Sequence, residues 1–194
     1  MITFTRKYFL LVIALTFSFA FAQVEVSHES IETPVVGISI SAGGDQTWEY
    51  TIPVEEMTLS FNPERVSSGF SLDVLILSKK FDGGNFILNG NAKNAILESK
   101  KFPEIRFSSE KVTLGALRQG VMETEVTGML MLHGVEREIV LPVQLELEGT
   151  NLAIKSAFSI LTTDYDMKIL EGFGFKLDDQ INLSLDLVAD ISEL

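Results

Sequence analysis

Cysteine is absent from the 194 residues of this chain, and histidine occurs only twice. The lack of cysteine excludes thiol nucleophiles, disulfides, thiolate metal sites and a lipid-modified N-terminal cysteine. Packing must therefore stabilise the fold, and a chain of this length can bury one sizeable core but hardly two. We expect a single folded domain.

Positive charge is also scarce, since 15 basic residues stand against 27 acidic ones and the net charge is -12. An acidic protein repels phosphate backbones, so nucleic acid is excluded as an expected partner. The sequence has no G-x-S-x-G, H-E-x-x-H or G-x-x-x-x-G-K-[ST] pattern, which removes the common hydrolase, metalloprotease and nucleotide-binding signatures. We expect no cofactor and no metal.

The N-terminus has the three parts of a secretory signal peptide. Arg6 and Lys7 supply positive charge, and residues 8 to 19 form an apolar run that is too short to span a bilayer comfortably. Ala20-Phe21-Ala22 follows as a small-x-small cleavage site. The pattern predicts cleavage before Gln23, and an uncleaved membrane anchor is the alternative.

Cleavage at that point removes residues 1 to 22 and leaves residues 23 to 194 as one acidic domain. We expect this domain to be periplasmic or secreted. No later segment approaches the length of a membrane-spanning helix. Residues 23 to 46 are the part whose structure the sequence predicts least well.

The rest of the chain alternates apolar and polar residues with a period of two, which is typical of half-buried strands. Residues 180 to 191 show it most clearly, and twelve residues at ~3.3 Å each make a strand of roughly 40 Å, a length that suits a tilted barrel. Short turns make neighbouring strands antiparallel. Further strands are expected at residues 47–52, 70–77, 105–109, 121–132, 139–147 and 152–160.

One segment has helical spacing instead. Residues 91 to 101 contain good helix formers, and Asn91 is a suitable capping residue. Pro103 pushes the residue before it out of the helical region, so we expect this short helix to end at Phe102. The whole pattern predicts an all-β, antiparallel barrel with one short helix.

Two local patterns resemble the YceI-like family. The first is Ser99-Lys100-Lys101-Phe102-Pro103-Glu104-Ile105-Arg106-Phe107. The second is Gly128-Met129-Leu130-Met131-Leu132-His133-Gly134-Val135-Glu136-Arg137, followed by Ile139, Leu141, Pro142 and Val143. Both occur in the order expected for that family. The resemblance implies an eight-stranded, lipocalin-like barrel that holds a polyisoprenoid or another long lipid in its lumen and performs no catalysis.

The apolar faces of the strands supply the candidate lumen residues. A barrel of about eight strands has an interior that side chains can fill or one small ligand can occupy, so both interpretations stay open. The candidate ligand-binding residues are Phe107, Leu130, Leu132, Ile139, Leu141, Val143, Phe158, Leu183 and Leu185, with Ile181 and Leu187 on the same inward face.

The polar candidates for chemistry are few. His133 is either a general base, with a carboxylate such as Asp164 as its partner, or a residue whose ring closes a hairpin. A zinc site would need His28 and His133 to converge with carboxylates. The acidic pair Asp178-Asp179 does not continue into calcium-loop spacing and is typical of a solvated turn.

Met129 and Met131 make their strand apolar on both faces. Either the helix near residues 92 to 98 or the N-terminal segment covers them, or they contact a membrane or a partner. A homodimer also stays open. Three functions therefore compete. They are a carrier of a long-chain lipid or isoprenoid, an interaction or envelope-stress module with a filled barrel and an acidic surface, and an enzyme that uses His133.

Overall fold

The structure is a computed structural model. It describes residues 24–27, 35–42, 46–61, 69–109, 112, 121–149, 151–172 and 175–190. The predicted leader at residues 1 to 22 lies outside the described residues, as do His28 and Ile191.

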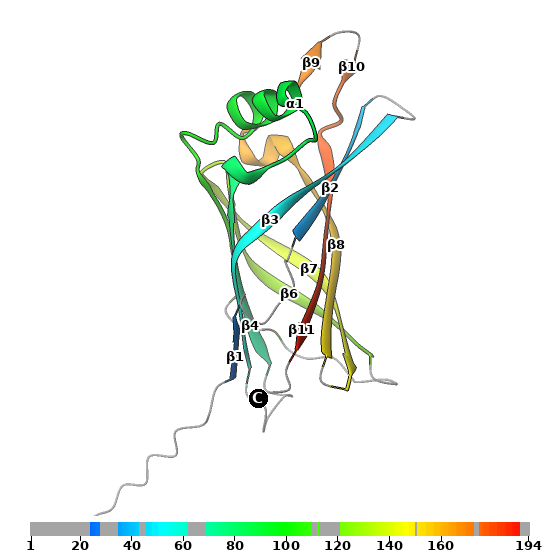
Figure 1. The fold of residues 1–194 in the computed structure, drawn as a ribbon. Coiled ribbons are helices and arrows are strands. Elements are labelled where there is room, and N and C mark those ends of the chain that lie inside the picture. Colours follow the sequence, from blue (N-terminus) through cyan, green and yellow to red (C-terminus); the bar gives the residue numbers. More distant parts are fainter. Residues whose placement is uncertain are drawn as a thin grey trace, which may run out of the picture.

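Eight antiparallel strands close into a barrel (Figure 1), which confirms the predicted fold class. They are β2 (Val35–Ala42), β3 (Gln46–Phe61), β4 (Phe70–Leu77), β5 (Glu104–Ser108), β6 (Val121–Leu132), β7 (Val135–Glu148), β8 (Asn151–Leu161) and β11 (Gln180–Asp190). The order is β3-β2-β11-β8-β7-β6-β5-β4, and pairing of β3 with β4 closes the ring. Closure leaves these strands without a long free edge, which removes a template for aggregation.

Three short strands lie outside the ring. β1 (Val24–Ser27) pairs with the end of β3, where Val24 stands opposite Phe61. β9 (Glu171–Gly172) and β10 (Phe175–Lys176) form a separate small hairpin above the barrel (Figure 1).

Alternation of burial explains the sheet. Along β11, Ile181 and Leu187 are buried, while the polar residues between them are exposed. The same face of β6 buries Val126, Leu130 and Leu132. Because successive side chains of a strand point to opposite faces, the period-two pattern places one apolar stripe of every strand inside the barrel.

Prolines mark the ends of two ladders. β3 runs through Pro53, which pairs with Val35 of β2, and its pairing with β4 begins only at Val54, where a bulge follows. β7 runs through Pro142, and its pairing with β8 extends only from Val143 to Glu148. Proline has no N–H to donate, so at its proline β3 pairs only with β2, and β7 pairs only with β6. Because β3 continues through Pro53 to Phe61, the strand predicted at residues 47–52 is much too short.

The helix lies earlier in the chain than predicted. α1 (Phe86–Asn91) begins after Asn85, whose side chain accepts a hydrogen bond from the Leu88 N–H at 2.9 Å. It continues as the π-helical segment η4 (Ala92–Ile96). One short helix is confirmed, but its predicted bounds were wrong. Within residues 91 to 101 only residues 91–96 are helical, because Asn85, not Asn91, caps the helix. The inward stripe is Leu88, Ala92 and Ile96, spaced by four residues.

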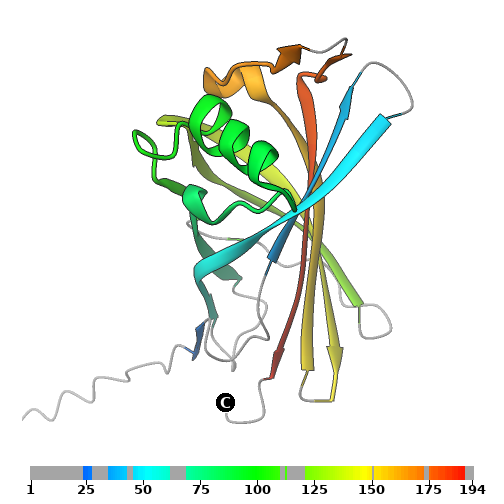
Figure 2. The ribbon, with the colours of Figure 1, turned by 45° about the horizontal axis from the view of Figure 1, so that its top comes forward.

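The helix ends well before Pro103. Glu98 adopts a left-handed conformation with a φ of 43°, and this turns the chain downward toward β5. Figure 2 shows α1 and η4 lying across the upper end of the barrel. Among the described residues, no helix has the length and apolar character needed to cross a membrane.

The two ends of the barrel interior differ. At the end away from α1, the inward side chains are deeply buried, and those below 4% exposure include Met57, Val112, Val126, Val143, Ile154 and Leu187. We call this the filled end. At the end beneath α1, several inward residues remain only partly buried, among them Ile38, Ile40, Leu183 and Leu185. We call this the open end.

Candidate ligand cavity

The open end contains a cavity of about 330 Å³, which falls in the range typical of small-molecule sites. Almost all of its surface is apolar. Its wall is built by inward residues from the strands: Val36, Ile38, Ile40, Trp48, Tyr50, Ile52, Leu72, Val74, Ile76, Ile105, Phe107, Leu130, Leu132, Ile139, Leu141, Phe158, Ile160, Ile181, Leu183 and Leu185.

A lid covers this cavity from two sides. Leu88, Ala92, Ile96 and Leu97 descend from the helix, and residues 167–170 and 177–178 contribute from the opposite side. Three lining residues in the lid, Asn91, Lys168 and Asp178, are also exposed to solvent, so the cavity opens at this end. A ligand would meet polar side chains only at the mouth.

The structure places the predicted lumen residues as follows. All of the candidate ligand-binding residues line the cavity except Val143. Val143 is 3% exposed, pairs with Thr124 and Ser156, and lies two residues further along β7 from the open end than Leu141. Ile181 also lines the cavity, whereas Leu187 packs in the filled end. Whether any of these residues binds a ligand is still a prediction.

Sequence reasoning missed the lid. Met167, Ile169 and Leu170 line the cavity from a segment without regular secondary structure, so no periodicity marked them. The four-residue spacing of Leu88, Ala92 and Ile96 was a readable signal for an inward helical face. Tyr50 lines the cavity too, and its ring packs against Phe81 with centroids 5.3 Å apart.

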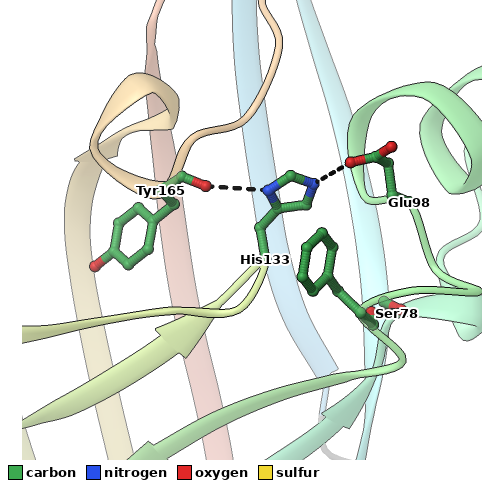
Figure 3. A network of polar contacts seen from close by, with 5 residues as sticks. Ser78, Glu98, His133 and Tyr165 are labelled. Carbon is green, nitrogen blue, oxygen red and sulfur yellow. Dashed lines mark hydrogen bonds and ion pairs between the residues drawn. The ribbon is translucent and has the colours of Figure 1, made fainter.

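His133 lies outside the cavity and joins three segments (Figure 3). Its Nδ1 is 3.1 Å from the carbonyl oxygen of Tyr165, and its Nε2 is 3.0 Å from a carboxylate oxygen of Glu98. Its ring packs on Phe102, with centroids 4.2 Å apart. The two family-like patterns of the sequence, residues 99 to 107 and 128 to 137, therefore meet in space at this contact.

The proton arrangement at His133 suits a structural role. A carbonyl oxygen only accepts, so Nδ1 donates to Tyr165, and Nε2 lies within hydrogen-bond distance of the Glu98 carboxylate. Both ring nitrogens are engaged and the residue is 8% exposed. Together with Gly134, His133 forms the β6–β7 turn, with φ values of 53° and 77°. An added Cβ at Gly134 would lie 2.6 Å from Phe102, so a side chain at that position has no room.

The proposed acid and base pair does not form. Asp164 turns away from His133 and makes an ion pair with Arg137, whose Nη2 lies 3.3 Å from Oδ1. This pair lines a polar hollow of about 420 Å³ where β7 and β8 separate. Tyr165 also lines that hollow. Burial raises the pKa of Tyr165, and its buried hydroxyl has no hydrogen-bond partner among the described residues.

Asp179 connects the start of β11 to the segment after β8 by hydrogen bonds. It accepts hydrogen bonds from the hydroxyls of Thr162 and Thr163 and from the Thr163 N–H, in the segment η5 (Thr162–Tyr165). These bonds, led by those from Thr163, hold the pKa of Asp179 below its usual value. Within the described ranges, no group of three or more acidic or histidine residues could hold a metal ion.

Met129 and Met131 lie on the outer face of β6, as predicted. Met129 is 44% exposed. The helix does not cover it, because α1 and η4 turn their apolar stripe toward the cavity instead. Residues 28 to 34 and the chain before Val24 lie outside the described residues, so the alternative that an N-terminal segment covers this face stays a prediction.

A closed antiparallel barrel whose open end encloses an apolar cavity defines a class of protein, the barrels that hold one small molecule in the lumen. Comparison with protein families places this chain more narrowly. The family model described as "YceI-like domain" matches residues 18–189, and the chain belongs to that family.

Three solved structures share the fold at low sequence identity. BcnA of Burkholderia cenocepacia has a TM-score of 0.64 at 18% identity, with 79% of this chain and 96% of that chain covered. A polyisoprenoid-binding domain from Saccharophagus degradans has a TM-score of 0.65 at 14% identity, with 87% and 99% covered. The YceI protein of Campylobacter jejuni has a TM-score of 0.54 at 18% identity, with 96% and 98% covered. A comparison with curated proteins found no match.

Proposed function

We propose that this protein is an exported, non-enzymatic carrier that holds a long-chain lipid or isoprenoid in the cavity at its open end. One observation supports the proposal above all others: an apolar cavity of about 330 Å³ inside a closed barrel. Its polar lining residues gather at the mouth, so the interior is suited to a hydrocarbon chain.

The energetics favour this class of ligand. Each methylene moved from water into an apolar site contributes ~0.8 kcal/mol, so a ten-carbon segment supplies on the order of 8 kcal/mol before ordering costs. Micromolar binding needs about 8 kcal/mol of net free energy. Burial of the chain therefore supplies free energy on the scale that micromolar binding needs, and a longer buried chain offsets the ordering costs without a charged contact.

Two further observations support the proposal without testing it. The Saccharophagus degradans neighbour is a polyisoprenoid-binding domain with the same fold. The predicted signal peptide at residues 1 to 22 is consistent with a periplasmic or secreted carrier. A carrier of this kind works by contact with membranes or partners, and a homodimer is compatible with it.

The test begins with purified protein. Solvent extraction followed by mass spectrometry should release a long apolar molecule, or added prenyl and acyl chains should bind to the empty protein. Protein that is repeatedly empty and binds neither chain would overturn the proposal.

A matched pair of variants locates the binding site. Ile38→Trp fills the cavity from β2 and should weaken chain binding at least tenfold while the barrel stays folded. Val188→Trp places the same ring on the exposed face of β11, where the side chain is 46% exposed, and should bind like the wild type. Equal binding by both variants would place the ligand outside the cavity.

A further inference from the structure

The start of α1 carries the most exposed apolar pair among the described residues. Phe86 is 91% exposed and Ile87 is 71% exposed. The other large apolar side chains on the surface are less exposed and lie on the barrel strands, such as Val140 at 52% and Val188 at 46%. We call Phe86 and Ile87 the α1 tip. Single exposed apolar residues are ordinary, but a fully exposed adjacent pair that includes phenylalanine indicates a contact surface.

The α1 tip is held outward by a built local structure. Asn85 caps the helix by accepting from Leu88. Asn89 accepts from the Gly83 N–H at 2.6 Å and donates to Asp82 at 2.9 Å, which closes the loop before the helix onto the helix itself. The exposure of Phe86 and Ile87 is therefore a feature of an ordered helix start with several hydrogen bonds.

The tip lies beside the cavity mouth. Leu88, the next residue, lines the cavity, and so does the exposed Asn91 one turn later. Figure 1 and Figure 2 both place α1 at the open end of the barrel, far from the filled end. A surface that receives the tip would therefore also face the entrance to the cavity.

The charge around the helix is opposite to that of the rest of the protein. Residues 79 to 101 contain five lysines but only two acidic residues, in a chain whose net charge is -12. Lys79, in the segment η3 (Ser78–Lys80), is exposed, and Lys93 is half-buried on η4. Lys80 is exposed as well but forms an ion pair with Glu55 of β3. A cationic segment in an acidic protein matches an anionic surface, and each lysine near such a membrane contributes about 1 kcal/mol.

We infer that the α1 tip docks the open end of the barrel on an anionic lipid bilayer. Phe86 and Ile87 enter the boundary between head groups and acyl chains, and Lys79 and Lys93 lie over the anionic head groups. A second copy of the chain fits this surface poorly. A stable interface buries roughly 800 Å² on each partner, far more than two side chains offer, and two such helices would bring lysines face to face. The docking itself needs no cargo, while its purpose as a loading step rests on the proposed carrier function.

Vesicle flotation of the proposed exported protein, residues 23 to 194, tests the docking. The probes are phosphatidylcholine vesicles with and without phosphatidylglycerol, at low and high salt. Wild-type protein should float with the anionic vesicles and lose most of that binding at high salt. The double variant Phe86→Ser with Ile87→Ser should bind at least tenfold less, as should Lys79→Glu with Lys93→Glu.

The matched control removes an exposed apolar pair from the barrel wall. Val140→Ser with Val188→Ser should float like the wild type. Wild-type levels of flotation for the tip variant, or an equal loss for the control, would overturn the inference. A wild-type protein that ignores vesicles and forms a dimer dissociated by the tip variant would overturn it in favour of self-association.

A second measurement separates this inference from the proposed function. Binding of a prenyl chain delivered without vesicles should be the same for wild type and tip variant, since neither Phe86 nor Ile87 lines the cavity. Flotation without chain binding would end the carrier proposal alone. Chain binding without flotation would end the docking inference alone.

Discussion

The two ends of this barrel are made from the same strands but are stabilised in different ways. On β11, Leu187 at the filled end is 2% exposed, while Leu183, four residues earlier on the same face, borders the cavity. The filled end is stabilised by apolar packing. The open end lacks that packing at its centre, and polar contacts of His133 and Asp179 connect its loops instead.

The difference shows how a small barrel keeps an empty interior. Apolar side chains that do not meet across the centre lose mutual contacts, and this loss must be offset elsewhere. Here hydrogen bonds between segments distant in sequence offset the lost contacts. One joins His133 to Glu98. Another two run from the Ser78 hydroxyl to the carbonyl oxygens of Phe102 and Pro103. Apolar packing thus stabilises the filled end, and hydrogen bonds between distant segments stabilise the open end.

The largest contrast is expected between two leucine truncations on β11. Leu187→Ala should lower the free energy of unfolding by about 3 kcal/mol, because it opens a void in a tightly packed region. Leu183→Ala should cost about 1 kcal/mol, since it only enlarges a space that already exists. Urea denaturation monitored by circular dichroism measures both values. Equal costs would mean that the two ends are packed alike.

The polar counterpart of that experiment is His133→Ala. It removes both contacts of the imidazole and should destabilise the protein by about 2 kcal/mol. Ser159→Ala, which removes an exposed hydrogen bond to Asn182 on the barrel wall, serves as the control and should change stability little. Thermal unfolding provides the comparison. If His133→Ala left the stability unchanged, the network in Figure 3 would not stabilise the open end.

A smaller effect of opposite sign is expected at Ser156, which lies between the two ends. Its hydroxyl is buried and has no partner among the residues that the structure describes. Because an unsatisfied buried polar group is costly, Ser156→Ala should stabilise the protein by about 1 kcal/mol. The measurement is the shift of the urea midpoint. A clear loss of stability would reveal a partner for that hydroxyl.

The smallest expected effect is the dependence of stability on acidic pH through Asp179. Hydrogen bonds from Thr163 and Thr162 favour the charged form of Asp179, so its folded pKa lies below the ordinary 3.8. The stabilisation is complete above pH 3.8 and is lost as pH falls through the lowered folded value. Asp179→Asn should therefore melt below wild type at neutral pH, with the gap closing under more acidic conditions. A gap that stays constant down to the lowest pH would contradict this assignment.

Much of the barrel was predictable from sequence because alternation reports which face of a strand points inward. The predicted bounds of β4 and β6 agree with the structure, and β11 alternates as expected. The pattern could not distinguish a filled interior from a hollow one. Val143 and Leu141 have the same chemistry and lie on the same face, yet only Leu141 reaches the cavity.

The errors had local causes. Pro53 ended the predicted strand too early, since a proline that keeps one ladder resembles one that ends the strand. The residue type of Asn91 predicts a helix cap there, but Asn85, six residues earlier, has the capping hydrogen bond. The lid segment at residues 167–170 has neither helical nor strand period, so only the three-dimensional structure shows that it lines the cavity.

Among the described residues, the cavity opens at the end beneath α1. A bound chain would then leave by the route along which it entered, with the atoms that entered last leaving first. Donor and acceptor would then have to approach the same face in turn. Transport would consist of separate visits, and the residence time of the cargo would be set where the helix meets the barrel rim.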